Sequence, residues 1–307
     1  MPYKLYNEGN FAIVSGTPAE VLTKLRDDGV FGSNRVVGMT KYGNTDVIVM
    51  YWTGGERGLI TGCNEYWNFN KRVGDSVFNS GYQGYSATLV SGATVSGTDV
   101  NNVTSNAAII LSGASIAAKQ PNMFQYVSLP SKDDINALQK GTVCGWIKTD
   151  WINSGMTIYE YSKTSEPNVY VRVRLTPTNN LEYTFRNSET LPHPTSSNYF
   201  VLSGSSVVLS GVWTHFGVTS DGAKVRLYVN GVEEATTLSS GANTGQWFGD
   251  IVTTSGTFSR HLGAHIVSGG FYESRVGDAF TGRMDNVRVV SYPLSGDDFA
   301  TYIESKL

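Results

Sequence analysis

Cysteine and charged side chains are both scarce in this 307-residue sequence. Its two cysteines, Cys63 and Cys144, are too few for a disulfide scaffold, and a structural zinc site usually needs four Cys or His ligands close together in sequence, so we expect two unpaired thiols. Charged residues make up 16% of the chain and sum to a net charge of −3. Because phosphate contacts need clustered Lys and Arg, this composition argues against nucleic acid as a partner.

Long apolar stretches are missing as well. No apolar run approaches the roughly 18 residues that a membrane-spanning helix needs, so we expect no membrane insertion. The first residues, MPYKLYNEGNFAIVSG, lack a basic region followed by an apolar one, so no ordinary secretory signal is visible. The chain either folds in the reducing cytosol where it is made or is already processed.

The residues that are abundant are those of an all-β protein. Ser, Thr, Asn, Val and Tyr are frequent, and 34 glycines are spread along the chain without a fixed period. Apolar and polar side chains alternate in residues 169–175, 181–186 and 224–229, and the last stretch runs into Asn230 and Gly231, a hairpin signal. Strands with one apolar and one polar face predict antiparallel sheets stacked as a sandwich.

The N-terminal residues 1–55 follow a different pattern. Thr17 and Glu20 form a capping box, which predicts a helix that begins there and ends at Gly29. The predicted strands around it are residues 11–14, 35–39 and 46–52. A β-α-β-β unit of this size has a small core, so we expect a domain that anchors or oligomerises the chain. A second capping signature, at Ser295, predicts a short C-terminal helix.

Five stretches beyond residue 59 carry a family pattern. They are residues 66–69 (YWNF), 78–89 (FNSG through GYSATL), 141–149 (GTVCGWIKT), 213–231 (WTHFGVTSDG through LYVNG) and 280–295 (FTGRMDNVRV through YPLS). In this order they resemble the laminin-G-like, concanavalin A-like lectin/glucanase jelly-roll family. The resemblance covers residues 59–307 and implies a mainly β fold, an antiparallel jelly-roll β-sandwich. The N-terminal segment resembles no family that its residues identify.

A sandwich of this family can be a hydrolase, which needs two carboxylates across a glycosidic bond. Glucanases of the fold usually carry E-x-D-x-E on one strand, and that motif does not occur here. Adjacent acidic residues point to opposite faces of a strand, so the acidic pairs of this chain are interpreted as turn or cap residues. They are Asp27 with Asp28, Asp133 with Asp134, Glu233 with Glu234, and Asp297 with Asp298. We therefore expect no catalytic residues and no enzymatic activity.

The histidines give no stronger sign of chemistry. His215 shares a predicted strand face with Trp213, and we interpret it as a structural residue with a hydrogen-bonded ring. His261 and His265 are spaced as i and i+4, but the glutamate of a zinc-binding H-E-x-x-H helix is absent and the context favours a strand. Zinc is therefore not expected.

Calcium is the cofactor that the resemblance makes plausible, because members of the family often bind it at a sandwich edge through oxygen ligands. The candidate ligands are Asp75, Asn79 and Asp285. Asn79 stands where the family usually has Asp, which removes a charge from the site. The alternative is that the Asp285 carboxylate caps the amides of a loop.

Aromatic residues beside polar ones in predicted loops are candidates for sugar binding. The apolar C–H face of a sugar stacks on a ring, while its hydroxyls bind polar side chains. The glycan-binding candidates are Trp151, Tyr199, Trp247 and Tyr272. The alternative is that some of these rings pack in the core or in a subunit interface.

The family is found mostly outside cells, whereas this sequence shows neither a signal peptide nor a disulfide framework. A virion structural protein of a bacteriophage, either a capsid decoration or a tail-fibre component, reconciles the two, because it assembles in the host cytoplasm and is extracellular after release. Residues 1–55 are then expected to contact other virion proteins and to form a homo-oligomer, and the lectin-like domain to bind a cell-surface glycan. The alternatives are a polysaccharide-degrading hydrolase of the same fold and a bacterial extracellular adhesion module.

Overall fold

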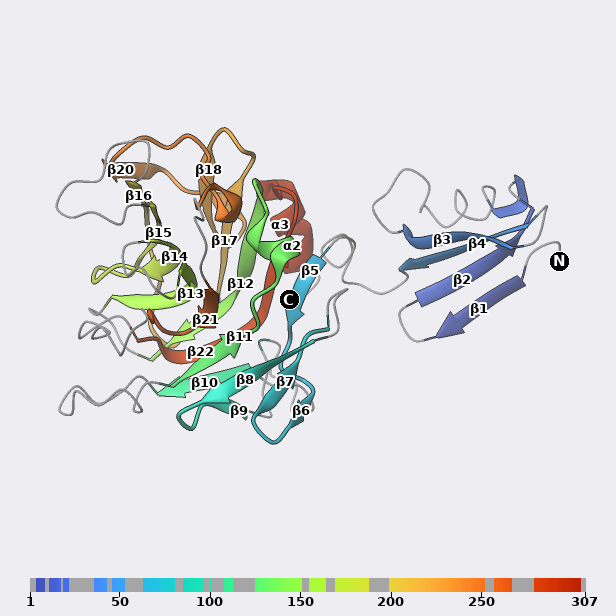
Figure 1. The fold of residues 1–307 in the computed structure, drawn as a ribbon, viewed down its shortest axis with the longest axis horizontal. Coiled ribbons are helices and arrows are strands. Elements are labelled where there is room, and N and C mark those ends of the chain that lie inside the picture. The colour runs from blue at the N-terminus through green and yellow to red at the C-terminus, as the bar shows by residue number, and fades with distance from the viewer. Residues whose placement is uncertain are drawn as a thin grey trace.

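The computed structural model describes residues 4–8, 11–17, 19–21, 36–42, 46–52, 63–80, 85–96, 100, 108–112, 125–150, 155–163, 169–187, 199–251, 257–266 and 279–304. The strands in these ranges form a four-stranded, an eight-stranded and a ten-stranded sheet. Figure 1 shows the two larger sheets together and the four-stranded sheet to one side of them. In the described part of the chain, no helix is long and apolar enough to cross a membrane.

The four-stranded sheet has the order β1-β2-β4-β3, and β1 is an additional strand ahead of the three that the sequence predicts. Its members are β1 (Lys4–Glu8), β2 (Phe11–Gly16), β3 (Val36–Tyr42) and β4 (Asp46–Trp52). The predicted helix start is confirmed: the Thr17 amide and hydroxyl donate to Glu20 Oε2 over 2.9 and 2.8 Å, and helical residues 19–21 follow. The continuation of that helix to Gly29 lies outside the described residues.

The two larger sheets stack as the predicted antiparallel sandwich. The eight-stranded sheet has the order β19-β18-β17-β12-β22-β10-β9, and β5 also pairs with β22. Its strands are β5 (Cys63–Trp67), β9 (Thr94–Ser96), β10 (Ala108–Ser112), β12 (Gly141–Thr149), β17 (Thr214–Ser220), β18 (Val225–Val229), β19 (Val232–Glu233) and β22 (Thr281–Val290).

The ten-stranded sheet has the order β20-β16-β15-β14-β13-β21-β11-β8-β7-β6. Its strands are β6 (Arg72–Val73), β7 (Ser76–Phe78), β8 (Ser86–Val90), β11 (Tyr126–Leu129), β13 (Met156–Lys163), β14 (Val169–Leu175), β15 (Asn180–Asn187), β16 (Tyr199–Val207), β20 (Thr236–Ser240) and β21 (Phe258–Leu262). The helical segments of the sandwich are α2 (Asp133–Asn136), the short η2 (Phe248–Asp250) and α3 (Gly296–Glu304).

The core lies between these two sheets and follows the alternation seen in the sequence. In β14, Val169, Val171 and Val173 are buried in the core. Their neighbours Tyr170 and Arg172 belong to the opposite face, because successive side chains of a strand alternate. The predicted use of the two strand faces is therefore confirmed for this strand.

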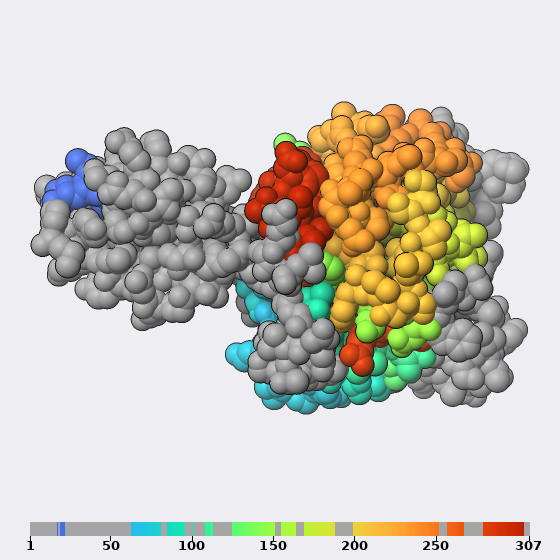
Figure 2. Space-filling view, turned by 180° about the vertical axis from the view of Figure 1, so that it is seen from behind, coloured from blue at the N-terminus to red at the C-terminus, as the bar shows by residue number. Residues whose placement is uncertain are grey.

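The C-terminal helix α3 covers the outer face of the eight-stranded sheet. Phe299 and Tyr302 are buried there, and a Cβ atom on Gly217 of β17 would lie 2.6 Å from the Phe299 ring, so only glycine permits this approach. Figure 2 shows α3, in red, beside the orange hairpin of β18 and β19. The predicted cap is confirmed, since the Ser295 amide donates to Asp298 Oδ2 over 2.8 Å and the Asp298 amide to Ser295 Oγ over 3.2 Å.

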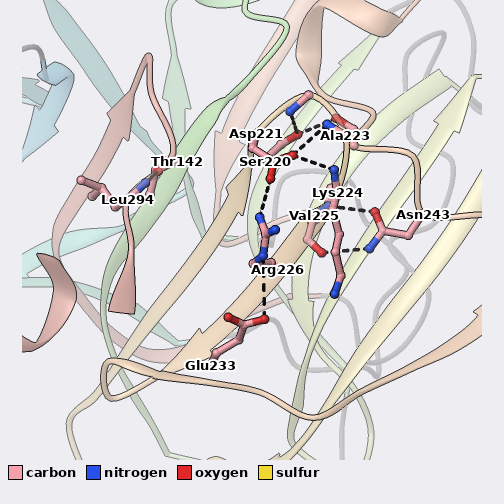
Figure 3. Close-up of polar contacts among 12 residues, drawn as sticks. Thr142, Ser220, Asp221, Ala223, Lys224, Val225, Arg226, Glu233, Asn243 and Leu294 are labelled. Carbon is pink, nitrogen blue, oxygen red and sulfur yellow. Dashed lines mark hydrogen bonds and ion pairs between the residues drawn. The ribbon is translucent and has the colours of Figure 1, made fainter. Parts of the chain in front are cut away.

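The turn between β17 and β18 is built around one carboxylate (Figure 3). Asp221 Oδ1 accepts from the amides of Ala223 and Lys224 at 2.8 Å, and Oδ2 lies 2.7 Å from Arg226 Nη1. The hydrogen bond from Arg226 and those from the amides lower the pKa of Asp221 to about 2. These contacts stabilise the turn of the β17–β18 hairpin. The Asn243 side chain adds two 2.8 Å hydrogen bonds, one to and one from the Val225 backbone.

The two cysteines are free and buried on either side of β22, as expected of unpaired thiols. Cys144 of β12 lies opposite Arg288 of β22, and Cys63 of β5 lies opposite Val290 of the same strand. Burial raises the pKa of each thiol to about 12. Thiolates are therefore rare at this site at neutral pH.

A fully buried ion pair joins the two sheets through the core. Arg260 Nη1 of β21 lies 2.7 Å from Glu65 Oε1 of β5, and neither side chain is exposed. The Tyr85 hydroxyl donates to the same carboxylate, while the Arg260 Nε donates to the Pro130 carbonyl over 3.1 Å. The Trp67 Nε1 donates to Glu65 Oε2 over 3.4 Å. Both charges thus have hydrogen-bond partners, as a buried pair requires.

Replacing Arg260→Met leaves the Glu65 carboxylate buried without its cation, so we expect the free energy of unfolding to fall by about 3–5 kcal/mol. The double change Glu65→Leu with Arg260→Met removes both charges and should recover most of the loss. Asp75→Asn is the control, because its pair with Arg72 is exposed at 3.7 Å and should change the free energy by less than about 1 kcal/mol. Denaturant titration measures all three, and a loss for Arg260→Met as small as the control's contradicts the prediction.

Candidate functional site

The outer face of the ten-stranded sheet carries polar and charged side chains over β13, β14, β15 and β16. Strand register places them in three rows across the sheet. The rows are Ser162, Tyr170, Arg186 and Tyr199; Glu160, Arg172, Thr184 and Val201; and Thr157, Arg174, Glu182 and Ser203. We call this set of residues the polar face. Eight of the twelve are buried, and Arg174, Arg186, Tyr199 and Ser203 are partly exposed, so these four are the members of the polar face that a ligand can reach.

Two arginines of the polar face lie over tyrosine rings. The Arg172 guanidinium carbon is 5.1 Å from the Tyr170 ring centre, and that of Arg186 is 5.8 Å from the ring centre of Tyr199. Tyr170 is nearly buried, whereas Tyr199 is partly exposed. Burial, together with the nearby Tyr170, raises the pKa of Tyr199 against the lowering influence of Arg186 and Arg172. Tyr199 therefore stays a neutral phenol beside two cations.

The third row is organised by one carboxylate. Glu182 Oε1 lies 2.6 Å from Arg174 Nε and accepts from the Thr184 hydroxyl at 3.3 Å, and Oε2 accepts from Ser203 Oγ at 3.1 Å. These donors come from three adjacent strands, β14, β15 and β16. Glu182 is thus held in place as part of the sheet's polar packing.

Glu160 is the second carboxylate of the polar face and is completely buried. Its Oε2 contacts His265 Nδ1, and its Oε1 accepts from the Ile266 amide over 3.1 Å, so residues after β21 fold back onto β13. Burial would raise the pKa of Glu160, but His265, His261 and Arg172 outweigh it and hold the pKa below its ordinary value. A carboxylate that prefers its charged form is poorly suited to donate a proton to a leaving group.

His261 lies opposite Glu160 on β21 and is buried. Burial lowers the pKa of His261 to about 4, so its ring is neutral near pH 7. Tyr126 contacts this ring edge-on at 5.3 Å between ring centres. His261 and His265 are both close to Glu160, and among the residues that the structure describes, no three His, Cys, Asp or Glu side chains gather as metal ligands would.

The predicted glycan-binding aromatics have different outcomes. Tyr199 lies on the polar face, at the first residue of β16 instead of in a loop. Trp247 is completely buried and stacks on Tyr183 with ring centres 5.7 Å apart and on Phe248 at 4.8 Å, so its prediction as an exposed ring is wrong. The polar neighbours of Trp247 in sequence suggest a loop, but the chain turns it inward. The other two candidates, Trp151 and Tyr272, lie outside the described residues.

The three calcium candidates have other partners. Asp75 is exposed beside Arg72, and Asn79 Oδ1 accepts from the Tyr66 amide at 2.7 Å. Asp285 is buried and accepts from the amides of Asn286, at 2.7 Å, and Val100, at 3.1 Å. The alternative interpretation of Asp285, as a cap for backbone amides, is confirmed, and calcium stays a prediction.

The interpretation of the acidic pairs as turn or cap residues is confirmed for two described pairs and wrong for Glu233, which lies in strand β19 opposite Tyr228. Asp133 and Asp134 lie in the first turn of α2, and Asp297 and Asp298 in the first turn of α3. Glu234 is buried and accepts from the amides of two serines of β16, at 2.9 and 2.7 Å. The remaining pair, Asp27 with Asp28, lies outside the described residues.

His215 is structural, as predicted, but its ring is not hydrogen-bonded. Its two ring nitrogens are buried without a hydrogen-bond partner among the described residues. The ring contacts Trp146 edge-on at 5.3 Å and lies 5.3 and 5.5 Å from the rings of Phe299 and Tyr302. Burial, with the nearby Arg288, lowers the pKa of His215 to about 3.

The family model of the concanavalin A-like lectin/glucanases superfamily matches residues 121–300, which include the whole polar face. The chain belongs to this superfamily. No curated protein matches it.

Solved structures share the fold at low sequence identity. The binding domain of botulinum neurotoxin DC, in complex with rat synaptotagmin II, has a TM-score of 0.55 and 12% identity over 80% of this chain and 52% of its own. The binding domain of Paraclostridial Mosquitocidal Protein 1 has a TM-score of 0.52 and 12% identity over 81% and 53%. A Ruminococcus gnavus IT-sialidase CBM40 bound to α2,3-sialyllactose has a TM-score of 0.46 and 17% identity over 63% and 92%. The first two likenesses show the fold.

The low pKa of His215 makes stability depend on pH. Between pH 6.5 and about 3 the unfolded chain protonates this histidine and the folded chain does not, so the free energy of unfolding should fall by about 1.4 kcal/mol for each pH unit below 6.5 on account of His215. His261 acts in the same direction down to about pH 4. His215→Phe keeps an aromatic ring in this position and should remove the part of the pH dependence of the free energy of unfolding that His215 causes.

Denaturant titrations at pH 7, 6 and 5 measure the slope for the wild type and the variant. His261→Phe serves as a parallel case on the opposite sheet and should remove a similar share. Equal slopes for the wild type and His215→Phe contradict the prediction.

Proposed function

We propose that this chain is a non-catalytic carbohydrate-binding protein and that the polar face holds the glycan. The observation that carries the proposal is the partly exposed Tyr199 ring at the first residue of β16, with the Arg186 guanidinium of the neighbouring strand 5.8 Å from its centre. A sugar needs an aromatic surface for its C–H face and fixed polar groups for its hydroxyls, and Ser203 with the Arg174–Glu182 pair supplies polar groups on the same sheet.

Two further points support binding in preference to hydrolysis. Membership of a lectin and glucanase superfamily is compatible with either function, so we compare the carboxylates of the polar face with those that a glycosidase needs. Glu182 is paired with Arg174, and Glu160 is buried with a lowered pKa, whereas a glycosidase needs one carboxyl group with a raised pKa as general acid. This pattern favours a binding face over an active site.

Tyr199→Ala is expected to weaken glycan binding by about 1–3 kcal/mol, judging from aromatic stacking on other planar ligands, with little change in stability. Glycan-array binding of the wild type identifies the sugar, and calorimetry with that sugar measures the loss. Tyr126→Ala is the matched control, because Tyr126 is a partly buried tyrosine on the same sheet, on the distant strand β11.

Trp247→Ala should show the opposite behaviour, with about 3–5 kcal/mol of lost stability from the emptied core and no direct effect on binding by the folded fraction. Absence of binding to every glycan, or equal losses for Tyr199→Ala and Tyr126→Ala, counts against the polar face as the site. Release of new reducing ends from a polysaccharide counts against a non-catalytic function.

We further propose the bacteriophage particle as the setting, with residues 1–55 as the segment that contacts other virion proteins and oligomerises. Supporting this division, the described strands β1 to β4 pair only with one another. A chain that begins at Leu59 is expected to keep its thermal transition and to lose self-association. Size-exclusion chromatography with light scattering compares it with the full chain, and unfolding of the shortened chain contradicts a boundary at this position.

A further inference from the structure

The polar face has more positive than negative side chains, whereas the whole chain has more negative ones. The chain carries 23 Lys and Arg against 26 Asp and Glu. The polar face carries three arginines, at positions 172, 174 and 186, against two carboxylates, Glu160 and Glu182. A cationic patch on an acidic protein points to an anionic ligand at that patch.

Both carboxylates already have cationic or amide partners. Glu182 lies 2.6 Å from Arg174, and Glu160 binds His265 and the Ile266 amide. Neither therefore depends on Arg186 for neutralisation. The excess positive charge of the face is concentrated toward the row of Tyr170, Arg186 and Tyr199.

Arg186 is the group best placed to meet a ligand anion. It lies between Tyr170 and Tyr199 in register, it is partly exposed, and no carboxylate among the described residues pairs with it. Its Nε is buried and makes no hydrogen bond within the described part of the chain. An arginine presents its donors as a planar fork that fits a carboxylate with two parallel hydrogen bonds.

The neighbouring tyrosine sets where the sugar ring would lie. Tyr199 contacts the Arg186 guanidinium and remains partly exposed, so a ring that touches Tyr199 brings its substituents to Arg186. Arg172 adds a second positive charge within electrostatic range of the Tyr199 hydroxyl. Neutral sugars use the ring contact and the polar groups of the face, whereas an acidic sugar gains an ion pair with Arg186 as well.

We propose that the polar face selects acidic glycans, with the sugar carboxylate bound by the Arg186 guanidinium and the sugar ring in contact with Tyr199. This inference rests on the proposed function, because it names the class of glycan that the same site takes. Uronic acids and sialic acids share the carboxylate and differ in its position on the ring.

Calorimetric titrations of the full chain with matched ligand pairs test the proposal. The pairs are tri-galacturonate against its methyl ester, and 3′-sialyllactose against lactose. We expect the acidic member of at least one pair to bind at least tenfold more tightly, with the preference shrinking as salt rises because a partly exposed ion pair is screened. Arg186→Gln should reduce the preference for the acidic member to less than twofold, and Arg186→Lys should retain part of this preference.

Arg226→Gln is the control, since Arg226 is a similarly exposed arginine that pairs with Asp221 on the other sheet. It should keep the full preference. Equal affinities for acidic and neutral ligands overturn this inference while the proposed glycan binding stands, and a preference that survives Arg186→Gln overturns the assignment to Arg186. Failure to bind any glycan overturns both. Thermal melts of each variant confirm that the affinities refer to folded protein.

Discussion

The buried pair of Glu65 and Arg260 is the constraint that most restricts how the two sheets of the sandwich pack, because neither charge tolerates the loss of the other. Two opposite charges in a dry core are tolerated only when each keeps its partners, and here those partners come from both sheets and from the Pro130 carbonyl. The pair therefore fixes how β21 lies against β5. The next residue of β21, His261, points to the other face and lies opposite Glu160. Strand β21 thus carries one member of the ion pair on its inner side and, on its outer side, a histidine that lies beside the polar face.

The polar face behaves as a prepared surface because most of its groups already hold one another. Glu182 accepts hydrogen bonds from three strands, and Glu160 ties the segment after β21 to β13. Side chains that are fixed before binding lose little conformational entropy when a ligand arrives. Arg186 and Tyr199, the two groups that we propose contact the ligand, lie together at one end of this network. Specificity can therefore reside in few residues while the rest of the face supplies rigidity.

Local patterns predicted the strands and caps but not the neighbours across the sheets. The alternation around Val171 and the capping pair of Thr17 and Glu20 depend on residues a few positions apart, and both are confirmed. Trp247 lies among glycines and polar residues that favour a loop, and its burial is decided by Tyr183, more than 60 positions earlier. The contact between Arg186 and Tyr199 depends on how β15 and β16 register, which the sequence does not specify. The site therefore emerges only once the register of the sheet is known.

The arrangement of the two cysteines has a consequence for where the protein can work. With β22 between them, Cys63 and Cys144 lie two strand spacings apart, about 9–10 Å, which is beyond the reach of a disulfide without backbone movement. Their high pKa values and burial also keep them from reacting with external thiols or oxidants. The fold gains nothing from oxidation and loses nothing on reduction. It is therefore indifferent to the redox potential of its surroundings, whether those are cytoplasm or open medium.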